Sequence, residues 1–113
     1  MEASVSPYLS FQGIPSAPTH VIALRQNGQA TILFDAPLNG GSPITLYTVT
    51  SSGGQIVTGT GLSIVVTGLT NGISYTFTVT ATNSFGTSDS SLVSNAVIPA
   101  NIPDAPTGLT PVR

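Results

Sequence analysis

The sequence predicts an all-β chain that folds as an antiparallel sandwich of seven short strands in two sheets. Short segments alternate apolar and polar residues with a period of two, as strands with one buried face do. Gly and Pro clusters separate these segments, and the chain holds 12 Gly and 9 Pro. Ser and Thr together number 30 while charged residues make up only 5%, and Thr suits a half-buried pleated surface.

The strands are expected between these turn signals. Period-two alternation covers residues 21–25, 29–34, 44–50, 62–67, 75–82 and 94–98, and a weaker strand is expected at 55–58. Asn27 and Gly28 separate the first two segments, and both residue types tolerate the positive φ of a tight hairpin turn. Seven short strands at this spacing are typical of a two-sheet sandwich.

Alternation also assigns the inward face of the strands. The side chains expected in the core are Ile32, Phe34, Tyr47, Val49, Ile64, Val66, Tyr75, Phe77, Val79 and Ala81. The outward positions between them are mostly Thr and Ser. Burying one large apolar side chain is worth about 1.5–3 kcal/mol before entropy, so this set can hold one domain together.

Residues 69–83 and the following Gly86 carry a family resemblance. The stretch reads LTNGISYTFTVTATN and resembles the second half of a fibronectin type III module, an immunoglobulin-like sandwich. In that family a Leu and a Tyr frame the corner before the sixth strand, which implies this role for Leu69 and Tyr75. The ring would fill the end of the core while its hydroxyl bonds to the backbone upstream.

The resemblance covers about residues 15–99. Pro15 to Pro18 resembles the Pro-rich beginning of the family, and residues 40–49 resemble its loop into the third strand. Phe34 stands where the family usually carries a core Trp, so a smaller core is expected. The sequence of residues 68–88 resembles bacterial or viral members of the family more than animal matrix members.

The end of the sequence repeats its beginning. Residues 103–113 line up with residues 15–25 at a constant offset of 88, with both Pro and the Ala, Thr and Arg identical. Self-similarity at a fixed period is typical of a repeat array. We therefore expect an irregular leader at 1–14, one module at 15–99, and at 100–113 a linker and the start of a second copy. The alternatives are a vestigial segment or one that docks on a neighbour as an added strand.

Charge and composition argue against several classes of partner. The net charge is −2 and the chain has only two Lys or Arg residues, whereas phosphate contacts need several. Nucleic acid is therefore not an expected partner. No run approaches the roughly 20 apolar residues of a membrane span, so membrane insertion is not expected, and the first residues lack the pattern of a secretory signal.

Catalytic and metal chemistry have little support in the sequence. The carboxylates are scattered singly, although an approach of Asp35 to Asp89 across loops stays open. His20 is the only imidazole, and without Cys or an acidic cluster no zinc or calcium ligand set exists. No Gly-x-Ser-x-Gly elbow accompanies it. The chain is predicted not to be an enzyme and to need no cofactor or metal.

Two features remain that could bind a partner. Loops 37–43 and 84–91 should lie at one end of the sandwich, where related domains recognise partners. The leader is more apolar than a free tail requires. The four candidates for partner contact are Tyr8, Leu9, Phe11 and Phe85. Binding of carbohydrate would need an exposed aromatic platform. The aromatic residues that are not assigned to the core are Tyr8, Phe11 and Phe85.

Three functional hypotheses follow. The repeat, the low charge and a Pro-restricted, stiff linker at 99–106 favour a structural or adhesive module. It would be a spacer, stalk or fibre component of a repetitive assembly that is extracellular, on a cell surface or on the exterior of a virion, acting through protein partners. The alternative is an accessory spacer or binding module of a secreted bacterial carbohydrate-active enzyme. The third is a stand-alone ligand-binding domain.

Overall fold

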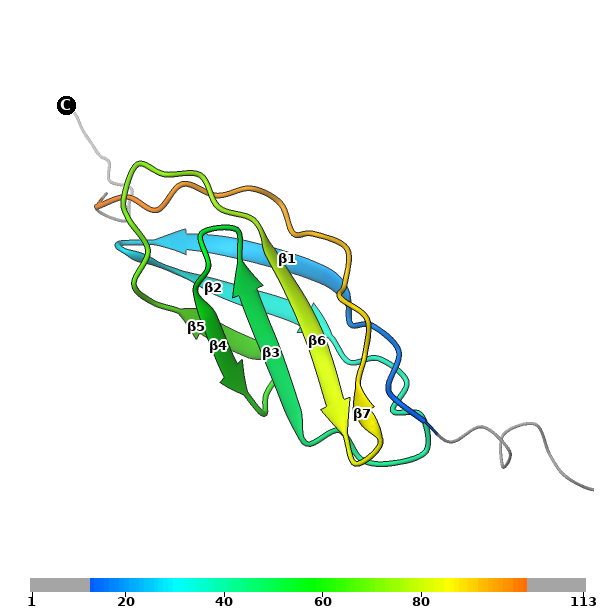
Figure 1. Cartoon of the computed structure of the whole chain (residues 1–113). Coiled ribbons are helices and arrows are strands. Elements are labelled where there is room, and N and C mark those ends of the chain that lie inside the picture. Colours follow the sequence, from blue (N-terminus) through cyan, green and yellow to red (C-terminus); the bar gives the residue numbers. More distant parts are fainter. Residues whose placement is uncertain (1–12, 102–113) are drawn as a thin grey trace, which may run out of the picture.

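The structure, a computed structural model, describes residues 13–101. Two antiparallel sheets face each other across one hydrophobic core (Figure 1). The strands are β1 (Thr19–Gln26), β2 (Gln29–Asp35), β3 (Leu46–Ser51), β4 (Ile56–Gly59), β5 (Ser63–Val66), β6 (Phe77–Asn83) and β7 (Gly86–Thr87). The described residues contain no helix.

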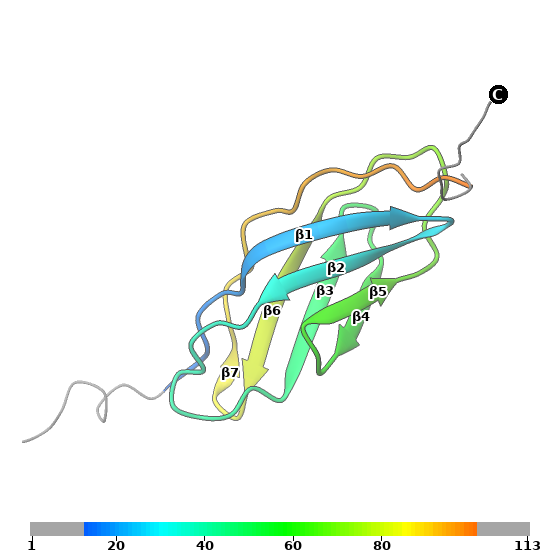
Figure 2. The same ribbon diagram turned by 180° about the vertical axis from the view of Figure 1, so that it is seen from behind.

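The two sheets contain three and four strands. One has the order β1-β2-β5 and the other the order β4-β3-β6-β7, and Figure 2 shows the three-stranded sheet in front of the other. The connection from β4 to β5 therefore passes from one sheet to the other. The β1–β2 hairpin closes with Gln26 opposite Gln29, and Gly28 in its turn has a φ of +67°. The fold is the all-β, immunoglobulin-like sandwich that the sequence predicts.

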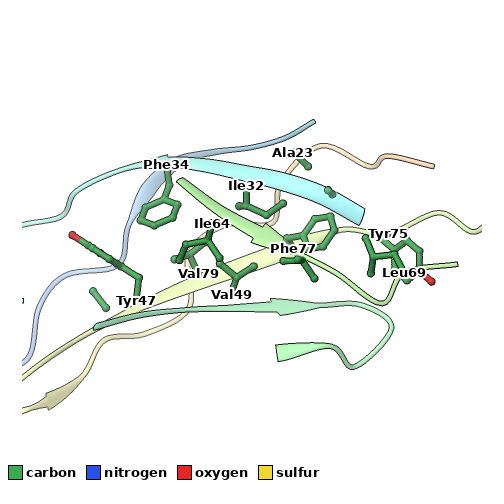
Figure 3. Packing of buried hydrophobic residues seen from close by; sticks show 13 residues of the cluster. Ala23, Ile32, Phe34, Tyr47, Val49, Ile64, Leu69, Tyr75, Phe77 and Val79 are labelled. Carbon is green, nitrogen blue, oxygen red and sulfur yellow. The ribbon is translucent and has the colours of Figure 1, made fainter. Parts of the chain in front are cut away.

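The core fills the space between the sheets (Figure 3). Its buried members are Ala23, Ala30, Ile32, Phe34, Tyr47, Val49, Ile64, Val66, Leu69, Tyr75, Phe77, Val79 and Ala81. Every residue that alternation assigns to the inward face is in this set, because successive side chains of a strand point to opposite faces. The threonines between them on β6, such as Thr78 and Thr80, are half-buried on the outer face.

Aromatic rings lie at both ends of the core (Figure 3). Phe34 and Tyr47 meet edge to face, with ring centroids 4.9 Å apart. At the other end Tyr75 lies beside Leu69, and the Tyr75 hydroxyl accepts a hydrogen bond from the amide of Thr70 at 2.9 Å. The ring is thus buried while the hydroxyl is satisfied by backbone five residues upstream, which is the corner that the resemblance implies.

The predicted strand at 94–98 is wrong. The structure has only an isolated bridge there, between Tyr75 and Val97. The seventh strand is β7, which lies in a segment expected to be loop. The apparent alternation at 94–98 misleads because Ser94 and Val97, three residues apart, face the module while the two residues between them are exposed. From Ser88 onward the chain follows β6 with a period of three.

Ser91 shows how this segment pairs with β6. Its amide donates to the carbonyl of Val79 at 2.9 Å, and its Oγ accepts a hydrogen bond from the amide of Val79 at 2.9 Å. The same hydroxyl donates to the carbonyl of Leu92. A hydroxyl thus replaces the backbone carbonyl that a regular strand would offer. The arrangement recurs at Ser88 with Ala81 and at Ser94 with Phe77.

Ser88, Ser91 and Ser94 together form what we call the serine ladder. Three residues per turn is the period of the polyproline II conformation, so every third side chain faces the same neighbour. All three serines are buried, whereas the residues between them are exposed. The second edge of β6 is therefore hydrogen-bonded without a second long strand.

Replacing Ser91 with Ala should lower the free energy of unfolding by about 1–3 kcal/mol, because the buried amide of Val79 loses its acceptor. Urea denaturation followed by circular dichroism measures this loss. Ser90 is the matched control, since it is exposed in the same segment, and Ser90→Ala should change stability by less than about 0.5 kcal/mol. Equal losses for the two variants would show that the ladder contributes nothing specific.

Tyr47 should make the module sensitive to alkaline pH. Burial raises the pKa of Tyr47 above its ordinary value of 10.0, because desolvation disfavours the phenolate. The folded state then holds the proton more tightly than the unfolded chain, so stability is unchanged below pH 10.0 and falls as the pH rises above it. Melting temperatures measured across this range should fall less steeply for Tyr47→Phe. An identical alkaline loss in the variant would contradict this assignment.

Candidate interaction surfaces

The described chain begins and ends at opposite ends of the sandwich (Figure 1). We define the N-terminal pole as residues 13–14, 37–43 and 84–86, and the C-terminal pole as residues 27–28, 70–73 and 99–101. The two loops that the sequence places at one end do meet at the N-terminal pole, where Ser42 Oγ and Ser84 Oγ lie 2.8 Å apart. The second of these loops, residues 84–91, leads away from the pole and includes the first two serines of the ladder.

Asn83, at the end of β6, holds the N-terminal pole together. Its side chain is only 4% exposed. Nδ2 donates to the carbonyls of Gly13 at 2.8 Å and Asn39 at 2.7 Å. Oδ1 accepts hydrogen bonds from the amides of Phe85 at 2.8 Å and Gly86 at 3.2 Å. Both donors and both acceptor positions of the carboxamide are used, so one side chain joins three segments of the chain.

A close backbone approach at the same pole requires a glycine at position 40. Gly40 has a φ of +74°, and a Cβ there would overlap the backbone of Gly13 and Ile14. The amide of Gly13 donates to the carbonyl of Gly40 at 2.9 Å. The start of the described chain is therefore attached to the pole by backbone as well as by Asn83.

The two most exposed large apolar side chains of the N-terminal pole are Leu38 and Phe85, and Ile14 is 43% exposed. Leu38 is 78% exposed and Phe85 is 52% exposed. Phe85 is one of the four contact candidates from the sequence; Tyr8, Leu9 and Phe11 lie outside the described residues. The pole contains no charged residue, so it offers apolar and amide groups to a neighbour.

Asparagines dominate the C-terminal pole. Asn71 Nδ2 donates to Asn27 Oδ1 at 2.9 Å, and Asn27 Nδ2 donates to Asn101 Oδ1 at 3.5 Å. Pro99 is fully buried, and its carbonyl accepts a hydrogen bond from the amide of Gly72 at 2.9 Å. The last described residues are thus attached to the body of the module. This pole also contains no charged residue.

A groove of about 410 Å³ lies between the start of β1 and the chain that carries the serine ladder. It is lined by Pro18, Thr19, His20, Val21, Leu92 and Val93. His20 Nδ1 lies 2.8 Å from Asp35 Oδ2, and the two side chains are 77% and 66% exposed. Exposed pairs of this kind contribute little to stability. The structure thus places Asp35 beside His20 at the rim of the groove.

The described residues give His20 one side-chain partner, the carboxylate of Asp35. The described part of the chain holds no group of three or more His, Cys, Asp or Glu that could bind a metal. In the same part no helix is long and apolar enough to span a membrane.

The outer faces of the two sheets differ in chemistry. On the four-stranded sheet threonines lie in register across three strands, with Thr48 between Thr58 and Thr80. On the three-stranded sheet the outer face presents four large apolar side chains, with Thr31 and Ser63 in register beside them. The four are Ile22, Leu24, Leu33 and Val65, each between 37% and 49% exposed. Neither face gathers titratable groups.

Sequence reasoning missed Asn95 as well as the serine ladder. Asn95 Oδ1 accepts a hydrogen bond from the amide of Ala23 at 2.9 Å, and its Nδ2 donates to the carbonyl of Ala23 at 3.0 Å. The carboxamide thus pairs with the outer edge of β1 as a strand would. The available signal was the spacing Ser-x-x-Ser-x-x-Ser followed at once by Asn, which has a period of three.

A three-plus-four-stranded antiparallel sandwich with the chain ends at opposite poles defines an immunoglobulin-like module. The sequence matches the fibronectin type III domain family over residues 16–97, and the chain belongs to this family. Domains of this family are generally non-catalytic modules that sit beside neighbouring modules in multi-domain proteins. No curated protein sequence matches the chain.

Several solved structures share the fold. Titin kinase with its flanking domains has a TM-score of 0.69 and 26% identity, with 77% of this chain and 17% of that chain covered. Domains A168–A170 of titin have a TM-score of 0.69 and 27% identity, with 75% and 32% covered. The twitchin kinase region from C. elegans has a TM-score of 0.72 and 24% identity, with 82% and 18% covered. The chain thus spans at most 32% of the length of these structures.

Replacing Asn83 with Ala should lower the free energy of unfolding by about 2–4 kcal/mol, because two carbonyls and two amides at a buried site lose their partner. Chemical denaturation measures the loss, and hydrogen exchange should be faster at the amide of Gly86. Asn39→Ala is the control at the same pole, since its exposed side chain accepts only from the amide of Gly41 at 2.9 Å. A loss no larger than that of the control would contradict the role of Asn83.

Proposed function

We propose that this chain is a non-enzymatic structural module of a repetitive extracellular or virion-surface assembly, where it serves as a spacer, stalk or fibre component. One observation carries the proposal. Residues 103–113 repeat residues 15–25 at an offset of 88, and the described chain starts and ends at opposite poles. A chain that begins at one pole and leaves at the other lengthens an array with every added copy.

Family membership supports a role in a chain of modules. The similar titin structures contain several domains, named as the flanking domains of a kinase and as domains A168–A170. In each of them the matching region is a fraction of a longer chain. Protein–protein contact with neighbouring modules is therefore the interaction that we assign to this chain.

The surface favours a spacer over a ligand-binding domain. Phe34, Tyr47, Tyr75 and Phe77 are all buried, which leaves Phe85 as the exposed aromatic among the described residues. A sugar-binding face normally presents an aromatic platform, and one ring does not make one. An accessory role in a secreted carbohydrate-active enzyme would then also be a spacer role, and the rest of the protein decides between the two.

The mass of the protein from its native source tests the tandem arrangement. We expect an intact mass well above 11.4 kDa, with peptides from further copies at the same offset. A catalytic domain in the same polypeptide would favour the carbohydrate-active alternative. An intact native mass of 11.4 kDa would overturn the tandem arrangement.

The proposed location has a separate test. Antibodies raised against residues 13–101 should label intact cells or particles, and added protease should remove the epitope without lysis. Labelling that requires permeabilised cells or opened particles would contradict a surface location.

The serine-ladder variant Ser91→Ala, if it lowers stability, should be removed faster by the same protease.

A further inference from the structure

We propose that consecutive modules abut, so that the N-terminal pole of the next module packs directly against the C-terminal pole of this one. The occupant of the C-terminal pole is thus a second copy of the same module, joined through the single residue Ala100. The proposal rests on the tandem arrangement proposed above and adds its geometry. It also assigns a partner to Leu38 and Phe85, which are otherwise left in solvent.

The repeat extends further back than its proline-rich part. At the offset of 88, Ile102 corresponds to Ile14, and Asn101 corresponds to Gly13. Gly13 is the residue whose amide bonds to Gly40 and whose carbonyl accepts from Asn83. A module is therefore held by its own pole from position 13 onward. In the second copy that position is Asn101.

The first module in turn holds the backbone of its chain up to Pro99. That residue is fully buried and bonded to Gly72. Ala100 is then the one residue between Pro99, the last whose backbone is held by one module, and Asn101, the first whose backbone would be held by the next. Two trans peptide units span at most about 7.6 Å between Cα atoms. The two poles are then separated by no more than a layer of side chains.

Asn101 can occupy the Gly13 position of the next module. A Cβ built on Gly13 meets no atom within 4 Å, and Gly13 is not among the glycines with positive φ. The side chain of Asn101 meanwhile bonds to Asn27 of the preceding module at 3.5 Å. In the tandem, Asn101 would contribute its side chain to one module and its backbone to the next.

The bulge in β1 supports the view that the second copy is a genuine module. His20 has a φ of +54°, and the pairing register of β1 with β2 shifts between Thr19 and Ile22. A left-handed conformation costs a non-glycine residue about 1–2 kcal/mol. The second copy has Gly108 at this position, the residue type that adopts positive φ without that cost.

The chemistry of the two poles fits direct contact. The N-terminal pole presents Leu38 and Phe85, and the C-terminal pole presents Ile73, which is 50% exposed, beside its asparagines. Apolar side chains at a junction lose water on contact. Since neither pole holds a charge, no like-charge repulsion opposes the contact, and the junction should be insensitive to salt.

A duplicated chain tests the junction. It consists of residues 1–101 followed directly by residues 14–113, so that Asn101 serves as position 13 of the second copy. The chain has no Cys, so Thr58→Cys in both copies places one spin label on an exposed strand of each module. Pulsed electron paramagnetic resonance then measures the distance between the modules. We expect a single narrow distribution that does not change between low and high salt.

Two variants separate contact from mere connection. Inserting Gly-Ser-Gly between Ala100 and Asn101 should widen the distribution roughly twofold or more, because such linkers are flexible coil. Leu38→Ser with Phe85→Ser in the second copy should widen it as well. The same pair in the first copy is the matched control, since that pole takes no part in the junction between the two copies, and it should leave the distribution narrow.

A broad distribution in the unmodified duplicate, or equal widths for the two placements of the double substitution, would overturn the abutting poles. Circular dichroism melts check that both modules stay folded, and the linker insertion tests the junction even where the double substitution lowers stability. The tandem arrangement itself is judged by the native mass. A native protein with further copies but a broad distribution would thus remove this inference alone.

Discussion

Both edges of β6 must be hydrogen-bonded, and the rest of the module is built around that requirement. On one edge β6 pairs with β3, with Val79 opposite Val49. On the other edge β7 covers only its last residues, and the serine ladder completes the pairing. The same strand supplies Phe77, Val79 and Ala81 to the core and ends at Asn83, which holds the N-terminal pole. Because a buried amide without an acceptor is costly, loss of the ladder would weaken sheet, core and pole together.

The edge of β1 is interrupted by a side-chain contact and a bulge instead of by charge. Sheet edges invite pairing with other chains, and many proteins protect them with Lys or with inward-pointing charges. A chain with 5% charged residues has few such groups to place. Here the carboxamide of Asn95 pairs with Ala23 on the edge of β1, and the bulge at His20 breaks the register of the same strand. These two features interrupt the regular row of backbone groups that the edge of β1 would otherwise offer.

Particular residues show which features of the fold the sequence predicts and which it does not. Alternation places Ile32, Val49 and Val79 correctly because a strand with one buried face repeats its apolar residues every second position. It fails at 94–98, where every third side chain faces β6 and a period of two appears by coincidence. The resemblance leads to Tyr75, whose hydroxyl meets Thr70. No comparable signal leads to Asn83 as the residue joining three segments, because its partners Gly13 and Asn39 are distant in sequence and are backbone carbonyls, which every residue has.

The sequence by itself determined the fold class, the inward face of the strands, the similarity of residues 103–113 to residues 15–25 and the scarcity of basic residues, because periodicity, composition and self-similarity are local or additive properties of a chain. The tertiary structure decided which hydroxyls act as backbone acceptors and which carboxamides hold the poles. These features depend on hydrogen bonds between segments up to 74 positions apart. Their geometry exists only once the two sheets have packed.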